Sequence, residues 1–154
     1  MRVIYETSAT ATHEARNGSV RSADGMLDVP LAAPKVLGGA GGATNPEQLF
    51  AAGYAACFTS AMLRVSREGK LAIGKPSVTV HSGLRSDGEN RFALFARIGV
   101  ALPEADREAA LAAIRDAHQI CPFSKAVRGN IDVEISLTDW DGAGAGETLA
   151  MDEV

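Results

Sequence analysis

One segment restricts the possible folds more than any other, because residues 45–69 have the marks of a long helix with almost no polar face. Asn45 is a preferred N-cap, Pro46 suits the first helical position, and Gln48 stands three residues after the cap. From 49 to 63 the helix is apolar on nearly every side. Such a helix must be buried on several faces, which a small monomer struggles to provide, so the pattern favours a homodimer.

The rest of the chain predicts a mixed α+β domain. The dipeptide Asp24-Gly25 is a strong signal for a hairpin turn. A second helix is expected from Pro103 to His118, and Pro122 begins a short third helix that Gly129 closes. Alternating or β-rich runs predict strands near residues 3–12, 20–22, 26–29, 77–85, 91–102 and 131–137. This order favours mostly antiparallel pairing within one domain over residues 1–138, followed by a flexible, glycine-containing tail over 139–154.

Composition narrows the functional classes only modestly. The chain has 154 residues, 46% hydrophobic and 22% charged, as globular proteins do. A net charge of −4 gives no support to nucleic-acid binding. There is no uninterrupted run of 18 apolar residues, so we expect no membrane span. The first 18 residues lack the apolar region of a secretory signal, so we expect a cytoplasmic protein.

The chain has two cysteines, and they stand far apart in sequence. Cys57 lies within NPEQLFAAGYAACFTSAM, and Cys121 opens CPFSKAVRGNIDVEI. Neither forms a CxxC motif, and in a reducing compartment such cysteines are more often reactive than structural. A free cysteine can also be a small hydrophobic core residue, which is the alternative for Cys57. Burial raises the pKa of a thiol, so a reactive Cys57 would need a nearby cation.

These segments carry a family resemblance. LGGAGGATNPEQLFAAGYAACF and CPFSKAVRGNIDV resemble the organic hydroperoxide resistance (Ohr) branch of the OsmC-like superfamily, and the resemblance runs from about Tyr5 to Leu137. It implies an OsmC-like fold, with antiparallel sheets wrapped around two long central helices in an intertwined homodimer. It also implies a thiol-dependent peroxidase that reduces alkyl and lipid hydroperoxides to alcohols without a cofactor. A dihydrolipoyl group of a lipoylated protein, or another dithiol, would be the reductant.

The resemblance suggests roles for four residues. Cys57 would attack the peroxide and become a sulfenic acid, and Cys121 would resolve that acid to an intramolecular disulfide. Arg16 stands where the Ohr pattern has an arginine, so it would stabilise the Cys57 thiolate, with Arg21 as the alternative cation. Glu47 would orient Arg16, although an acid in the first turn of a helix is favourable in any case.

The position of Glu47 raises a question of geometry. It precedes Cys57 by ten residues, which correspond to about 15 Å along a helix. One straight helix therefore cannot bring the two into contact. If two copies cross near Gly53, Glu47 of one chain approaches Cys57 of the other. An early break in the helix is the alternative.

Five apolar residues are candidates to line a pocket for a hydrophobic peroxide tail, although core packing is an alternative role for each. They are Phe50, Phe58, Met62, Ile120 and Phe123.

Other types of function remain open. His81 and His118 could complete a zinc site with the two cysteines, but the spacings fit no compact metal module, so we expect no metal. An OsmC-type osmotically inducible peroxidase would use the same thiol chemistry with another preference for substrate or reductant. A non-enzymatic thiol redox sensor would use the disulfide as a switch.

Overall fold

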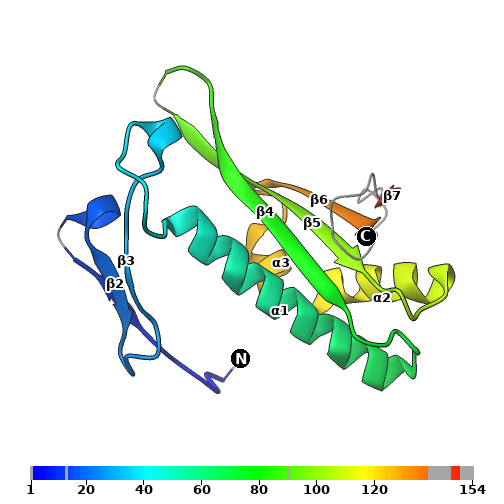
Figure 1. The fold of residues 1–154 in the computed structure, drawn as a ribbon. Coiled ribbons are helices and arrows are strands. Elements are labelled where there is room, and N and C mark those ends of the chain that lie inside the picture. Colours follow the sequence, from blue (N-terminus) through cyan, green and yellow to red (C-terminus); the bar gives the residue numbers. More distant parts are fainter. Residues whose placement is uncertain (1, 13, 90, 139–146, 150–154) are drawn as a thin grey trace. The chain divides into compact units, whose positions relative to one another are not determined.

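The computed structural model describes residues 2–12, 14–89, 91–138 and 147–149, and the chain divides into two compact units, Met1–Leu49 and Phe50–Val154 (Figure 1). Each unit has a sheet of its own. The long helix α1, Pro46–Gly69, begins in the first unit and continues into the second.

The N-terminal unit contains a three-stranded antiparallel sheet. Its second hairpin turns at Gly25, which has φ = 73° and follows the predicted Asp24-Gly25 signal. The Asp24 carboxylate accepts hydrogen bonds from the Ser22 hydroxyl at 2.5 Å and the Met26 N–H at 3.0 Å, so the turn satisfies its own polar groups. The elements are β1 (Ala9–Ala11), the 3-10 turn η1 (Ala15–Asn17), β2 (Ser19–Ser22), β3 (Asp28–Pro30) and the 3-10 turn η2 (Lys35–Leu37).

The predicted strand over residues 3–12 is mostly wrong. Only β1 pairs, with three residues of β2, and its side chains are exposed. Val3, Ile4 and Tyr5 are 76%, 87% and 77% exposed. An alternating pattern forms a strand only where a neighbouring strand and an apolar face are available, and the four-residue β2 offers neither to these residues.

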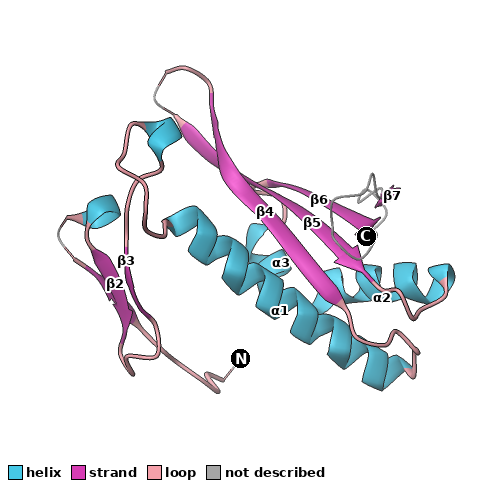
Figure 2. Ribbon diagram, viewed as in Figure 1, coloured by secondary structure: helices cyan, strands magenta, loops and turns pink. Residues whose placement is uncertain are grey.

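The C-terminal unit combines helices with a four-stranded sheet of order β4-β5-β6-β7 (Figure 2). β4 pairs antiparallel with β5, and β6 with β7, whereas β5 and β6 are parallel. The parallel pair arises because two helices connect β5 to β6 as a crossover. The elements after α1 are β4 (Ser77–Ser86), β5 (Phe92–Ala101), α2 (Arg107–Ile120), α3 (Pro122–Val127), β6 (Asp132–Thr138) and β7 (Glu147–Leu149).

The second helix begins later than the sequence pattern predicts. α2 starts at Arg107, not at Pro103, because Asp106 is its N-cap and accepts a 2.9 Å hydrogen bond from the Ala109 N–H. Residues 103–105 form the turn before this cap. A side-chain cap satisfies one of the unpaired donors of the first turn, which favours a start at this point.

Strand β7 lies inside the segment predicted to be a flexible tail. It pairs with Ile135, Ser136 and Leu137 of β6, and Leu149 is buried in the core. The rest of the predicted tail, 139–146 and 150–154, lies outside the described residues.

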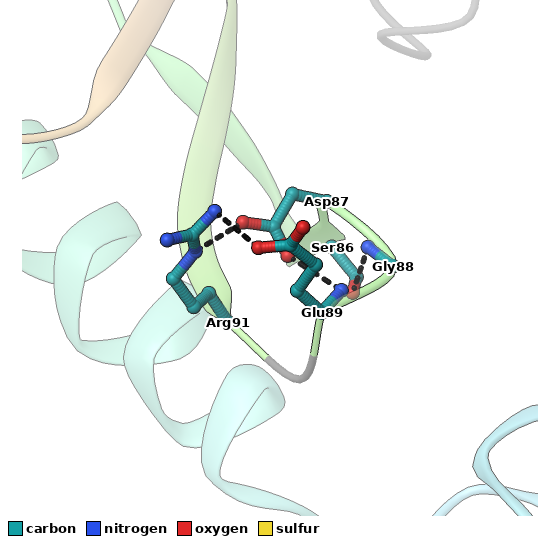
Figure 3. A network of polar contacts seen from close by, with 5 residues as sticks. All are labelled: Ser86, Asp87, Gly88, Glu89 and Arg91. Carbon is teal, nitrogen blue, oxygen red and sulfur yellow. Dashed lines mark hydrogen bonds and ion pairs between the residues drawn. The ribbon is translucent and has the colours of Figure 1, made fainter.

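The strands expected near 77–85 and 91–102 are confirmed as the antiparallel hairpin β4–β5, and a polar network stabilises its turn (Figure 3). Gly88 has φ = 86° and donates its N–H to the Ser86 hydroxyl at 3.1 Å. Asp87 accepts the N–H of Glu89 at 2.9 Å, and Arg91 bonds the carboxylates of Asp87 and Glu89. These exposed contacts satisfy the polar groups of the turn locally.

Helix α1 supplies much of the core of the C-terminal unit. Its buried residues are Tyr54, Phe58, Ala61, Met62 and Val65. They pack with α2 and with alternate residues of the sheet, including Ile98, Val100 and Ile135.

The opposite side of α1 is exposed. Leu63 there is 43% exposed, and Ala52, Ala56 and Ser60 lie along the same side. α1 is also long and apolar enough to cross a membrane, by length and composition only. The expectation that no segment spans a membrane rested on the lack of an uninterrupted run of 18 apolar residues, a criterion that α1 escapes. The core helix of a soluble protein can also be long and apolar enough to meet the criterion of length and composition.

Candidate active site

The fold brings the two cysteines together. Cys57 lies in the middle of α1, and Cys121 lies between α2 and α3, 64 residues later. Their sulfur atoms are 3.4 Å apart, and both cysteines are free thiols. Cys121 is fully buried and Cys57 is half-buried, so a small reactant would reach Cys57 first.

The backbone around Cys121 explains where its side chain lies. Its N–H makes the last helical bond of α2, to the Ala117 carbonyl, and its extended dihedrals (φ −61°, ψ 121°) end that helix. Pro122 then occupies the first turn of α3, with Cys121 as the N-cap residue. The Cys121 thiol makes no capping hydrogen bond and instead points to Cys57.

The pKa of Cys57 is raised above its ordinary value. Burial is the main cause, a hydrogen bond from the Phe123 backbone N–H opposes it, and the neighbouring Cys121 raises the pKa further. None of these influences is a cation. A thiolate at neutral pH would therefore need a nearby positive charge.

The N-terminal unit contains an ion pair between Arg16 and Glu47. The Arg16 guanidinium donates two hydrogen bonds to the Glu47 carboxylate, at 2.8 and 3.2 Å, as the predicted pairing requires. Arg16 is in η1 and Glu47 is in the first turn of α1. Arg21, the alternative cation, instead lies 3.6 Å from Asp28 in an exposed pair.

The bonds from Arg16 are the main cause of a lowered pKa for Glu47, with burial opposing them. Because this pKa is depressed on folding, the ion pair contributes to stability above the ordinary pKa of a glutamate. That contribution is lost as the pH falls through the lowered value. Glu47 therefore stays ionised, and Arg16 stays oriented, at neutral pH.

The segments that carry the two thiols also contribute an aromatic cluster in the C-terminal unit. The Tyr54 ring lies 5.7 Å from the rings of Phe50 and Phe123 and 6.4 Å from that of Phe58. The Tyr54 hydroxyl is 2.9 Å from the Ser124 hydroxyl, and both groups are buried. The sequence pattern does not predict the pairing of Tyr54 with Ser124. The i, i+3 spacing on α1 does place Tyr54 near Cys57.

The five residues predicted to line a pocket separate into two groups. Phe50, Ile120 and Phe123 are half-buried and pack against the core. The Phe123 N–H bonds the Cys57 sulfur, the Phe50 ring lies 6.3 Å from the Phe123 ring, and Ile120 directly precedes Cys121. Phe58 and Met62 are 0% exposed, so they are core residues and line no surface that is open in this chain. Both side chains belong to the core cluster that α1 forms with the sheet and α2, which is the alternative role given for them above.

Gly53 has a role within the chain that differs from the predicted crossing of two copies. A Cβ atom at this position would lie 3.3 Å from Cζ of Phe123, a tight contact. The missing side chain therefore lets α3 pack closely on α1. A larger residue at position 53 would disturb this contact within the chain. The loss of a dimer in such a variant would therefore not show that Gly53 lies where two copies cross.

The structure does not gather the residues of the alternative zinc site. Among the described residues, no three His, Cys, Asp or Glu side chains cluster as metal ligands would. His118 is buried, and burial, with a smaller contribution from the charge of Arg128, lowers its pKa to about 4. Its Nδ1 atom has no hydrogen-bond partner among the described residues, and at neutral pH the ring is uncharged.

Comparison with known proteins agrees with this geometry. The family described as OsmC-like protein matches residues 39–136. An organic hydroperoxide resistance protein of Xanthomonas axonopodis pv. citri is 44% identical over 138 residues, covering 88% of this chain and 96% of the relative.

Two solved structures are also similar. An organic hydroperoxide resistance protein from Legionella pneumophila has a TM-score of 0.84 at 43% identity, covering 88% of this chain and 98% of its own. OhrB of Bacillus subtilis has a TM-score of 0.79 at 36% identity, covering 88% of this chain and all (100%) of its own. With this sequence and fold, the chain belongs to the OsmC-like family, in its organic hydroperoxide resistance branch.

Proposed function

We propose that this protein is a thiol-dependent peroxidase that reduces organic hydroperoxides to alcohols. The observation that carries the proposal is the pair of free thiols with sulfur atoms 3.4 Å apart, one half-buried and one fully buried. This arrangement suits an attacking thiol and a resolving thiol. The names of the relatives, which refer to organic hydroperoxide resistance, support the choice of substrate class.

In this proposal the reaction has three steps, which are attack on the peroxide, formation of the disulfide and its reduction. The Cys57 thiolate attacks the distal oxygen of the peroxide, the O–O bond breaks, and the departing alkoxide takes up a proton to become the alcohol. Cys57 is then a sulfenic acid. The Cys121 thiol condenses with it, forming the S–S bond and releasing water. An external dithiol opens this disulfide by exchange and is itself oxidised to a disulfide.

In this proposal Arg16 stabilises the Cys57 thiolate, and Glu47 orients the guanidinium. The paired geometry supports the idea, since a bidentate carboxylate holds the planar group in one orientation. An arginine remains charged at any working pH, so it can also hydrogen-bond a peroxide oxygen.

The substrate pocket in this proposal involves Phe50, Ile120 and Phe123, which are half-buried beside the thiols. Their apolar surfaces suit an alkyl or lipid-derived peroxide better than hydrogen peroxide. The scheme needs no metal, haem or flavin. We further propose a dihydrolipoyl protein or another dithiol as the reductant, a cytoplasmic location, and one functional domain over residues 1–138.

A steady-state assay tests this function. We expect turnover of an alkyl hydroperoxide with dihydrolipoamide, slower turnover of hydrogen peroxide, and little recycling by a monothiol. A protein that oxidises once per thiol pair and then stops, with every dithiol offered, would instead be a redox sensor. Equal turnover of both peroxides would remove the apolar pocket from the proposal and favour an OsmC-type preference.

We also propose a homodimer in which Arg16 and Glu47 of one chain serve Cys57 of the other. The exposed side of α1, with Ala52, Ala56 and Leu63, supports an interface on this helix. The helical distance between positions 47 and 57, about 15 Å, supports a site shared between copies.

Mixing two inactive variants tests the shared site. If Arg16→Ala and Cys57→Ser chains are co-refolded, the mixed dimer contains one site with both wild-type residues only when the site spans the interface. We then expect up to about half of the wild-type activity per mixed dimer, because one of two sites is intact.

The matched control mixes Arg16→Ala with Glu47→Gln, which restores no site in either arrangement because both residues come from the same chain. No recovery in the first mixture, with mixed dimers verified by native mass spectrometry, would place the whole site within one chain.

A further inference from the structure

One buried hydrogen bond joins the two segments that carry the thiols. The Tyr54 and Ser124 hydroxyl oxygens are 2.9 Å apart, although the residues are 70 positions apart in sequence. Both residues are 0% exposed. Either hydroxyl can donate, and each satisfies the other in a region without access to water.

This hydrogen bond lies close to the thiol in both segments. Tyr54 precedes Cys57 by three residues on α1, and Ser124 follows Cys121 by three residues in α3. The hydrogen bond therefore joins the same two segments as the thiol pair, about one helical turn from each sulfur. The 3.4 Å distance between the sulfur atoms and the 2.9 Å distance between the hydroxyl oxygens both depend on how α3 packs against α1.

The Phe123 backbone N–H also bonds the Cys57 sulfur, and the ring contacts between α1 and α3 are apolar. The Phe123 ring packs 5.7 Å from the Tyr54 ring and lies over Gly53. Apolar packing holds the helices together but is non-directional, so by itself it permits α3 to slide or rotate. A hydrogen bond is directional and weakens steeply away from linear geometry. The Tyr54–Ser124 bond therefore restricts the position of a helix only six residues long, together with the weaker N–H···S bond from Phe123 to Cys57.

We infer that Tyr54 and Ser124 are positioning residues that hold Cys121 within reach of Cys57 while the disulfide forms. The inference rests on the proposed peroxidase function, of which it specifies the resolution step.

The resolution step depends on this placement. The two sulfurs, now 3.4 Å apart, must approach to about 2.05 Å as the S–S bond forms and water leaves. A displacement of α3 by even part of an ångström would lower the effective concentration of the Cys121 thiol. The competing reaction is attack of the Cys57 sulfenic acid on a second hydroperoxide, which yields a sulfinic acid and another alcohol. Fast resolution thus protects Cys57 from irreversible oxidation.

The test compares Tyr54→Phe, Ser124→Ala and the double variant with wild type. The first readout is the equilibrium of the Cys57–Cys121 disulfide with glutathione, which needs no peroxidase chemistry. The second is the ratio of disulfide to Cys57 sulfinic acid after peroxide treatment, measured by mass spectrometry. We expect the equilibrium constant for the disulfide to fall about fivefold in all three variants, the effect of one lost hydrogen bond. The sulfinic acid fraction should rise in the same variants.

The double variant separates positioning from stability. Each single change leaves one buried hydroxyl without a partner and lowers stability, whereas the double change removes both hydroxyls and should recover much of that loss. If Tyr54 and Ser124 position Cys121, the double variant should recover stability but should still have the lowered equilibrium constant for the Cys57–Cys121 disulfide. Thr59→Val is the matched control, because the Thr59 hydroxyl bonds the Ala55 carbonyl of its own helix and should leave both readouts as in wild type.

Two results would overturn the inference. One is a wild-type equilibrium constant in all three variants. The other is an equilibrium constant that merely follows the free energy of unfolding from variant to variant. If peroxide oxidises no thiol even in the wild type, the peroxidase proposal fails, while the glutathione equilibrium still decides the positioning role.

Discussion

Cys57→Ser is expected to abolish hydroperoxide turnover, leaving only the uncatalysed background. A serine hydroxyl is not ionised at neutral pH and cannot form a sulfenic acid, so neither attack nor resolution occurs. The measurement is alkyl hydroperoxide consumption with a dithiol present, together with mass spectrometry of the protein after peroxide treatment. In this variant the remaining Cys121, which is fully buried, should stay reduced.

Cys121→Ser is the comparison that assigns the two roles. This variant should still be oxidised once by peroxide, gaining one oxygen at Cys57, and should then progress to the sulfinic acid as peroxide increases. It should form no intramolecular disulfide. If Cys121 in the Cys57→Ser protein takes up the oxygen instead, the attacking and resolving roles are reversed.

Arg16→Ala should give the second large effect, a loss of activity at neutral pH that is partly recovered at higher pH. Burial raises the pKa of Cys57, so removing the cation that this proposal places beside it lowers the thiolate fraction at neutral pH. The direction follows from the charge: a nearby cation favours the ionised thiol, so its removal raises the pKa. The pH–rate profile should therefore move to higher pH by roughly one to three units.

Two related variants distinguish charge from geometry. Arg16→Lys keeps the charge but loses the two parallel hydrogen bonds to Glu47, so we expect an intermediate rate with a smaller shift of the profile. Glu47→Gln keeps the shape of the side chain but not its charge, and should lower the rate by releasing Arg16. Titration of the thiolate absorbance checks the pKa directly. A wild-type thiol pKa and rate in Arg16→Ala would exclude Arg16 from the mechanism.

Local chemistry determined several elements that the sequence alone predicts correctly. Asn45 caps α1 by accepting a 2.9 Å hydrogen bond from the Gln48 N–H, and Gly25 and Gly88 turn their hairpins with positive φ. Each of these signals acts over a few residues, so the residues that produce it stand next to one another in the sequence. The resemblance to the Ohr branch also predicted the fold, because two long motifs together identify that fold and composition alone does not.

Contacts between distant residues were decided only by the tertiary structure. The 3.4 Å thiol separation, the Tyr54–Ser124 bond and the contact of Phe123 with Gly53 all depend on how α3 packs against α1. A pattern within one segment contains no information about the distance to another segment. For the same reason the sequence does not distinguish Phe58 and Met62, which are fully buried, from Phe50 and Phe123, which are half-buried.

The strands illustrate the same division. Residues 3–7 have a strand-like pattern but pair with no strand in the described part of the chain, whereas the three residues of β7 pair with β6 despite a weak local pattern. Helix caps and turns are satisfied by their own neighbours, so the amino-acid sequence alone determines them. Strand pairing, the burial of a thiol and its pKa depend on what the rest of the chain places beside it, and only the folded protein provides those neighbours.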